Sequence, residues 1–180
     1  MGALILGLLL ALLVFWAVGA HNRLVRLRAE VVRQWSSVDA VWLRLLVRMQ
    51  GGMAARQSLT TPTGEDDLQA LQSACDELLE ALSQARLQPL DGESQKQVQA
   101  QHQKVVAEIR RMLQTSNDAV KPDLDIALNR MRQTLPAALI PYHVAVAAYN
   151  DALAMQPASW LARRLKLQPA MRMDLSMGAA

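Results

Sequence analysis

The first twenty residues, Met1 to Ala20, contain no charged side chain. An α-helix rises about 1.5 Å per residue, so a helix of this length spans roughly 30 Å, the thickness of the hydrocarbon core of a bilayer. Phe15 and Trp16 lie near the end of this stretch, and aromatic rings favour the headgroup region of a membrane. We therefore predict a single transmembrane anchor over residues 1–21.

A cleaved signal peptide is the alternative, because Val18-Gly19-Ala20 resembles a small-residue cleavage site. Signal peptides carry a basic segment before an apolar stretch of about 7–15 residues. This chain has no Lys or Arg before Arg23 and its apolar stretch is longer, which favours the anchor. Basic residues stay on the cytoplasmic side of a membrane. Because Arg23, Arg26, Arg28 and Arg33 follow the stretch, we expect the N-terminus outside and the rest of the chain in the cytoplasm.

The composition of the 180-residue chain favours helices after the anchor. It has four Trp, two Tyr, one Phe and eight Gly, and its long segments are rich in Ala, Leu, Gln and Arg. The single cysteine, Cys75, excludes an intrachain disulfide, and we interpret it as a small core residue. The net charge of +3 is modest, and much of the positive charge lies next to the anchor, where anionic lipid headgroups explain it better than nucleic acid.

Apolar residues recur at alternating three- and four-residue spacing in four segments, about 22–50, 65–87, 93–115 and 122–156. That spacing places them on one face of an α-helix. The expected buried faces are Leu24, Leu27, Val31, Trp35, Val38, Val41, Trp42, Leu45 and Met49; Leu68, Leu71, Cys75, Leu78, Leu82 and Ala85; Val98, His102, Val105, Ile109 and Met112; and Leu124, Leu128, Met131, Leu135, Ala138, Tyr142, Ala145, Tyr149 and Ala152. We predict an all-α domain over residues 22–158, an up-and-down, coiled-coil-like four-helix bundle whose first helix continues from the anchor.

Glycine and proline punctuate these segments. Gly51-Gly52 is expected to end the first helix, and residues 57–64 form a polar linker. Pro136 and Pro141 interrupt the last segment, yet its apolar spacing continues across both. We therefore predict one kinked helix there rather than two separate helices.

Residues 159–180 form a basic, amphipathic tail. We expect Trp160, Leu161 and Leu165 to dock on the bundle while the cations stay in water. The alternative is that this tail contacts the membrane surface. Residues 171–180 are expected to fray.

Two blocks of sequence resemble the LemA family of membrane-anchored helical proteins of bacteria. The first follows the anchor and contains Asn22, Leu24-Val25, Leu27-Arg28, Trp35-Ser36 and Val38-Asp39. The second contains Tyr142-His143, Ala145-Val146 and Tyr149-Asn150 and ends at Pro157. His21 and His143 stand where the family usually has Tyr and Asn, so the chain resembles a divergent member.

The resemblance implies a four-helix bundle on a single span of the bacterial inner membrane. It implies no established enzymatic activity, and it implies membrane-associated assembly, because some relatives help to organise specialised membranes. The residues that we expect to mediate interactions or to fix the register of the helices are Asn22, Trp35, Asp39, Trp42, Tyr142, Tyr149 and Asn150. We hypothesise that Asp39 or Asn22 meets a tyrosine hydroxyl or Asn150 inside the bundle, joining the first and last helices.

The chain has no phosphate-binding glycine loop, no His-Glu-x-x-His motif and no paired cysteines. We therefore predict that the chain is not an enzyme, holds no metal or cofactor and does not bind nucleic acid. The favoured function is a membrane-anchored scaffold that contacts lipids and self-associates or holds membrane-protein partners, with Trp42, Leu46 and Met49 as exposed contact residues. The alternative is a small-molecule or cofactor-binding bundle, for example a haem protein using His102 with Met112 or Met131.

Overall fold

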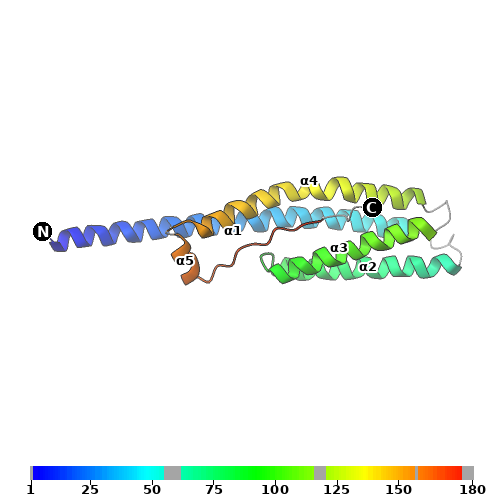
Figure 1. The fold of residues 1–180 in the computed structure, drawn as a ribbon, viewed down its shortest axis with the longest axis horizontal. Coiled ribbons are helices and arrows are strands. Elements are labelled where there is room, and N and C mark those ends of the chain that lie inside the picture. The colour runs from blue at the N-terminus through cyan, green and yellow to red at the C-terminus, as the bar shows by residue number, and fades with distance from the viewer. Residues whose placement is uncertain (1, 55–61, 116–120, 157, 176–180) are drawn as a thin grey trace.

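The computed structural model describes residues 2–54, 62–115, 121–156 and 158–175. Every regular element in these ranges is an α-helix, and they contain no strand. Figure 1 shows the helices, which are named α1 to α5 in chain order. The fold is therefore all-helical, with one long apolar helix at its N-terminus.

Helix α1 runs from Gly2 to Ala54 without interruption. Its first buried residue is Leu24, and burial then recurs at helical spacing as far as Met53. The predicted end at Gly51-Gly52 is therefore wrong, because the helix continues through both glycines to Ala54. Met53, which follows the glycines, packs into the core. The two glycines have open space around them and tolerate the helical backbone.

Helices α2 (Pro62–Leu87) and α3 (Gly92–Thr115) are joined by a short turn. Asp91 caps α3, because its Oδ2 accepts hydrogen bonds from the Ser94 backbone N at 2.9 Å and from Ser94 Oγ at 2.7 Å. These hydrogen bonds lower the pKa of Asp91. The predicted linker over residues 57–64 lies largely outside the described residues, and α2 begins at Pro62, since proline fits the first turn of a helix.

Helix α4 (Lys121–Ala154) contains both Pro136 and Pro141, which confirms the prediction of one helix across them. Both prolines are exposed, whereas the adjacent Leu135 and Tyr142 are buried. The helix curves along its length in Figure 1. Proline in a helix removes a backbone hydrogen bond and crowds the preceding turn, so curvature is the expected response.

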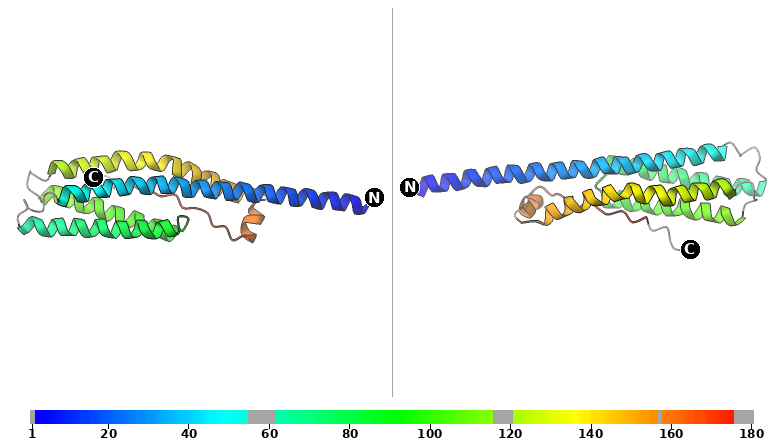
Figure 2. Two further views of the ribbon diagram at one scale, coloured as in Figure 1. Left: turned by 180° about the vertical axis from the view of Figure 1, so that it is seen from behind. Right: turned by 90° about the horizontal axis from the view of Figure 1, so that it is seen from above.

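The four long helices lie side by side, and successive helices run in opposite directions (Figures 1 and 2). Helix α1 packs mainly on α4, and α2 packs mainly on α3. The N-terminal part of α1 projects beyond all the other elements (Figure 1). The molecule is therefore an elongated helical domain with a single bare helix extending from one end.

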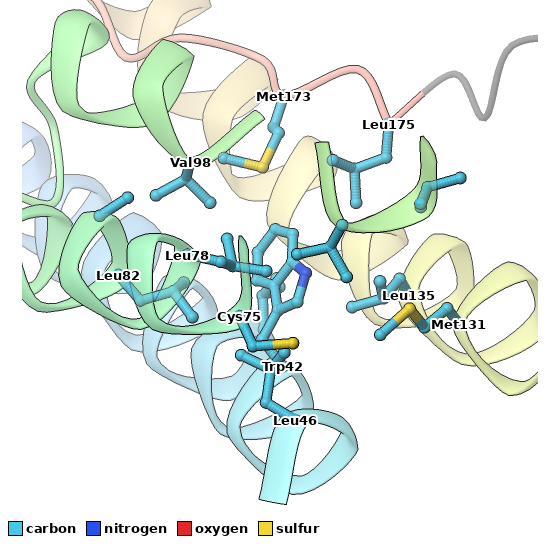
Figure 3. Packing of buried hydrophobic residues seen from close by; sticks show 14 of the residues in the cluster. Trp42, Leu46, Cys75, Leu78, Leu82, Val98, Met131, Leu135, Met173 and Leu175 are labelled. Carbon is cyan, nitrogen blue, oxygen red and sulfur yellow. The ribbon is translucent and has the colours of Figure 1, made fainter. Parts of the chain in front are cut away.

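The core of this domain follows the predicted apolar faces. Most of the residues assigned to them from the sequence spacing are buried, including the polar His102, whereas Leu27, Val41, Leu45 and Ala138 are half-buried against the core. Figure 3 shows Trp42 of α1 among Leu78 of α2, Val98 of α3 and Leu135 of α4. Trp42, Leu46 and Met49 thus lie in the core, and the prediction that they form an exposed contact surface is wrong. The spacing identified a buried face correctly, but the helix has too many neighbours to leave part of that face uncovered.

The chain after α4 forms the short helix α5 (Ala158–Arg164), a turn at residues 165–166 and then an extended segment, residues 167–175. Lys166 has a φ of 52°, in the left-handed region, and Leu167 N donates to Ala162 O at 3.0 Å. This hydrogen bond and the left-handed residue form the helix-ending motif that reverses the direction of the chain. The extended segment then returns along the domain (Figure 1).

Two predictions for the tail are wrong. Trp160 and Leu165 are exposed rather than docked, Leu161 is half-buried, and Ala162 is the buried residue of α5. Met173 and Leu175 are buried in the main core, so residues 171–175 are not frayed; residues 176–180 lie outside the described residues. The described part of the tail therefore belongs to the same core as the helices, which the predicted boundary at residue 158 did not anticipate.

Candidate functional site

The first candidate site is the part of α1 that precedes its first buried residue, Leu24, and that no other element covers. An 18-residue window of α1 has a mean hydropathy of 2.7, none of the window is buried, and by length and composition it is the one described helix able to cross a bilayer. The large apolar side chains from Leu4 to Val18 are exposed. An uncovered apolar surface of this size is unfavourable in water and marks a site of contact with lipid or another apolar partner.

The second feature is an aromatic cluster in the core, where α1, α3 and α4 meet. The Trp35 ring lies 6.1 Å from the Trp42 ring and 5.8 Å from the Tyr142 ring, measured between centroids. The Trp42 ring lies 5.9 Å from the ring of His102, in an edge-on arrangement. Such separations and tilts are favourable for aromatic pairs. Trp35, Trp42 and Tyr142, which the sequence suggested for interaction or register, are thus brought together in the interior with His102.

His102 is held neutral within this cluster. Trp42 Nε1 donates a hydrogen bond to His102 Nδ1 at 3.4 Å, so Nε2 is the nitrogen that carries the proton. Burial lowers the pKa of His102 to about 4. His102 Nε2 and Trp35 Nε1 have no hydrogen-bond partner among the described residues. Met112 and Met131, the suggested partners of His102 in a haem site, are packing residues of the same core cluster.

Asp39 pairs with a residue that the sequence did not suggest. Arg86 of α2 donates to both carboxylate oxygens of Asp39, from Nε to Oδ2 at 2.8 Å and from Nη2 to Oδ1 at 3.2 Å. The hypothesis that Asp39 or Asn22 meets a tyrosine or Asn150 is therefore wrong, because Asp39 is turned toward α2 and Asn22 is exposed. Asp39 ties α1 to α2 and not to α4.

The third feature is a set of four α4 side chains that hold the extended C-terminal segment by its backbone. We call Tyr142, His143, Tyr149 and Asn150 the α4 clamp. Tyr142 Oη donates to Met171 O at 2.9 Å, and Tyr149 Oη donates to Gln168 O at 3.2 Å. His143 Nε2 lies 2.7 Å from Met173 O, and because a carbonyl only accepts, Nε2 is the protonated nitrogen. Asn150 binds both backbone groups of Ala170.

The register of the clamp follows from the rise of a helix and of an extended chain. Seven residues separate Tyr142 from Tyr149, and seven separate His143 from Asn150. Seven helical residues rise about 10 Å, which is also about the length of three extended residues. The carbonyls that the two tyrosines bind belong to residues three apart, 168 and 171, and the same holds for 170 and 173. One heptad of α4 thus matches three residues of the extended segment.

The clamp holds the backbone of the extended segment so that several of its side chains pack into the core. Ala170, Met173 and Leu175 are buried, and Met171 contacts Gly92 at the start of α3, with its Sδ 3.8 Å from the position of an added Cβ. Figure 3 shows Met173 directed toward Val98 of α3 and Leu175 lying above Leu135 of α4. Residues 167–175 therefore contribute a fifth packed element between α3 and α4.

Burial keeps the clamp tyrosines in their donor state. It raises the pKa of Tyr142 to about 12 and also raises the pKa of Tyr149. Sequence reasoning found Tyr142, Tyr149 and Asn150 but assigned them to the wrong partner. The available signal was the repeated pair, Tyr-His and then Tyr-Asn one heptad later, which places a row of hydrogen-bonding groups along one edge of the buried face.

Comparison with protein-family models, with curated proteins and with solved structures gave no match. No group of three or more His, Cys, Asp or Glu suited to hold a metal ion occurs among the residues that the structure describes. The site features are thus the bare apolar helix, the buried aromatic cluster and the α4 clamp.

Proposed function

We propose that this chain is a membrane-anchored scaffold: an up-and-down four-helix bundle that stands on a single transmembrane span and acts through binding rather than catalysis. In this proposal residues 1–21 cross the inner membrane of a bacterium, the N-terminus lies outside, and the bundle lies in the cytoplasm. Copies of the protein associate beside the membrane, and lipids are its first partner.

The observation that carries the proposal is the continuity of α1. One helix from Gly2 to Ala54 has an entirely exposed apolar half and a half packed in the core. A continuous helix transmits position and orientation, so a bilayer that holds the first half also fixes the second half at a set height and direction. Arg23, Arg26 and Arg28 are exposed just after the apolar half, where positive charge favours the cytoplasmic surface.

Membrane extraction tests the anchor. Leu9→Arg with Leu12→Arg places two charges in the middle of the apolar half, and each costs about 3 kcal/mol in a bilayer. We expect the variant to be released from membranes by alkaline carbonate, whereas the parent protein stays with them. Val47→Arg is the matched control, because Val47 is an exposed apolar residue on the packed half of the same helix. Equal retention of all three proteins would refute the span.

The surface available for self-association differs from the one expected from the sequence. Residues 133–150 of α4 contain no Asp, Glu, Lys or Arg. On the outer side of this stretch Ile140 and Val144, four residues apart, are 64% and 65% exposed. Anchored copies share one orientation relative to the membrane, so the same stretch of two molecules lies at the same height. We therefore propose this outer side of α4 as the contact between copies.

Cysteine crosslinking tests this contact. Val144→Cys is expected to form a disulfide-linked dimer in membranes, because the proposed contact brings residue 144 of two copies together. The native Cys75 is buried and should not form such disulfides. Val47→Cys supplies an equally exposed thiol on α1, and it should crosslink much less. Equal crosslinking at the two positions would indicate random collision and would exclude the α4 contact.

We also propose that the chain is a divergent member of the LemA family. The support is the two sequence blocks, at Asn22 to Asp39 and at Tyr142 to Pro157. The clamp gives the second block a physical role, since its Tyr-His and Tyr-Asn pairs bind the backbone of the C-terminal segment.

A further inference from the structure

Helix α5 exposes an apolar and basic surface that the packing of the domain does not explain. Trp160 is 62% exposed and Leu165 is 42% exposed, while Ala162 packs inward. Arg163 and Arg164 follow Trp160 by three and four residues and are exposed on its side of the helix. An indole ring left in water beside two guanidinium groups is the arrangement of a helix that rests on a membrane surface.

The position of α5 is the second observation. It lies beside α1 at the place where the bare apolar part of α1 ends and the domain begins (Figure 1). In Figures 1 and 2 the axis of α5 is turned across the direction of α1. If α1 crosses a bilayer, α5 then lies along the plane of the membrane surface rather than along its normal.

The charge around α5 is the third observation. Residues 158–167 contain Arg163, Arg164 and Lys166 and no Asp or Glu. All three cations are exposed. Exposed Arg23 and Arg26 flank Leu24, the first buried residue of α1, so they lie where the domain begins and add to the positive surface. Each cation close to an anionic leaflet contributes favourably to binding, so this end of the molecule fits acidic lipid headgroups.

We propose that α5 is a second membrane contact, in which Trp160 and Leu165 enter the headgroup region of an anionic leaflet and Arg163, Arg164 and Lys166 bind lipid phosphates. This inference rests on the proposed transmembrane span. Together the two contacts fix the rotation of the domain about α1, because a single span allows rotation about its own axis and a lateral contact does not. The outer side of α4 is thereby held in one direction along the membrane.

Depth-dependent fluorescence quenching tests the contact in the full-length protein. A small fluorophore is attached to Leu165→Cys, and the protein is reconstituted with lipids that carry a quencher either at the headgroup or on the acyl chain. Val14→Cys reports the span, and Gln133→Cys, exposed on α4, serves as the control away from this end. The parent protein provides the labelling blank, since burial raises the pKa of Cys75 to about 12 and suppresses its reactivity.

The expected result, in phosphatidylcholine mixed with phosphatidylglycerol, is quenching at residue 165 by the headgroup quencher and at residue 14 by the acyl-chain quencher, with no quenching at residue 133. Arg163→Glu with Arg164→Glu should lower the docking equilibrium constant of α5 at least roughly 30-fold, from about 1 kcal/mol per lost cation. Arg130→Glu with Arg132→Glu makes the same change of charge on exposed α4 positions and should have no effect.

The failures of the two proposals are distinguishable. Quenching at residue 14 without quenching at residue 165 would overturn the α5 contact and leave the span intact. Quenching at residue 165 that is equal in pure phosphatidylcholine, or that survives the double glutamate substitution, would also overturn an anionic-lipid contact. Absence of quenching at residue 14 would instead refute the span itself.

Discussion

Asn150 and Ala170 form a reciprocal pair: the Asn150 amide donates to Ala170 O at 2.9 Å and accepts from Ala170 N at 2.9 Å. A side-chain amide that pairs with both the N–H and the C=O of one residue replaces the pairing that a neighbouring strand would give. The extended C-terminal segment is thus held in place by a helix, without a sheet. Because these hydrogen bonds go to the backbone, the clamp fixes the path of the segment whatever its side chains are.

Replacing Asn150 by Ala should loosen the C-terminal segment. Two hydrogen bonds are lost, each with a net value of about 0.5–1.5 kcal/mol, and the free energy of unfolding should fall by about 1–3 kcal/mol. Denaturant unfolding measures this change, and limited proteolysis should cut the chain near residue 170 faster. Asn129→Ala is the control, because Asn129 of the same helix makes only an exposed hydrogen bond to Asp125. Equal effects of the two substitutions would contradict the role of the clamp.

The two clamp tyrosines should differ in their contributions. Tyr142→Phe removes a 2.9 Å hydrogen bond to Met171 O, and Tyr149→Phe removes a 3.2 Å hydrogen bond to Gln168 O. Gln168 is exposed, so water can satisfy its carbonyl after the substitution, whereas Met171 is partly buried. We expect both variants to melt at lower temperature than the parent protein, with the larger loss for Tyr142→Phe. The reverse order in thermal unfolding would show that burial of the carbonyls does not govern the cost.

The pairing of Asp39 with Arg86 should be worth more than an exposed ion pair. The Asp39 side chain is 10% exposed and receives two hydrogen bonds, so its loss should cost about 1.5–3 kcal/mol. A double-mutant cycle with Asp39→Ala and Arg86→Ala measures the coupling energy. The Lys104–Glu77 pair, at 2.6 Å with side chains 46% and 40% exposed, provides the comparison, and its coupling should be about 0–1 kcal/mol. Similar coupling energies in the two cycles would argue against Asp39 as the link between α1 and α2.

The stability of the helical domain should fall in mildly acidic solution because of His102. Its pKa is about 4 in the folded protein, below the ordinary value of 6.5, because burial disfavours the charged form, so the unfolded chain binds the proton more tightly. The contribution of neutral His102 to the free energy of unfolding is fully present above pH 6.5. It is lost progressively as the pH falls to about 4, and the total loss is about 3 kcal/mol.

His102→Gln isolates this effect, because glutamine does not titrate in this range and its amide oxygen can still accept a hydrogen bond. Carboxylates that titrate near pH 4 are present in both proteins, so the difference in the free energy of unfolding between parent and variant reports His102. The free energy of unfolding of the parent protein minus that of the variant should fall as the pH falls from 6.5 to 4. A difference that is independent of pH would show that His102 is not buried in the neutral form.

The sequence by itself determined the helices and which side of each is buried. The spacing of Val98, Val105 and Ile109, for example, admits one helical face, and all three residues are in the core. It also determined that one helix crosses Pro136 and Pro141, because the apolar spacing keeps its phase across both residues. Periodicity is a local property, so a single segment contains all the information that these predictions need.

The tertiary structure alone decided the partners. Asp39 lies on the side of α1 that faces α2 and Arg86, and this depends on the rotation and order of the helices, which residue spacing does not specify. It also decided that Trp42 is enclosed, because burial depends on how many neighbours a face has. Residues 165–175 have no helical or strand periodicity, so nothing local predicts their path. Their position follows from directional hydrogen bonds to Tyr142, Tyr149 and Asn150, groups that come within reach only after the chain has folded back along α4.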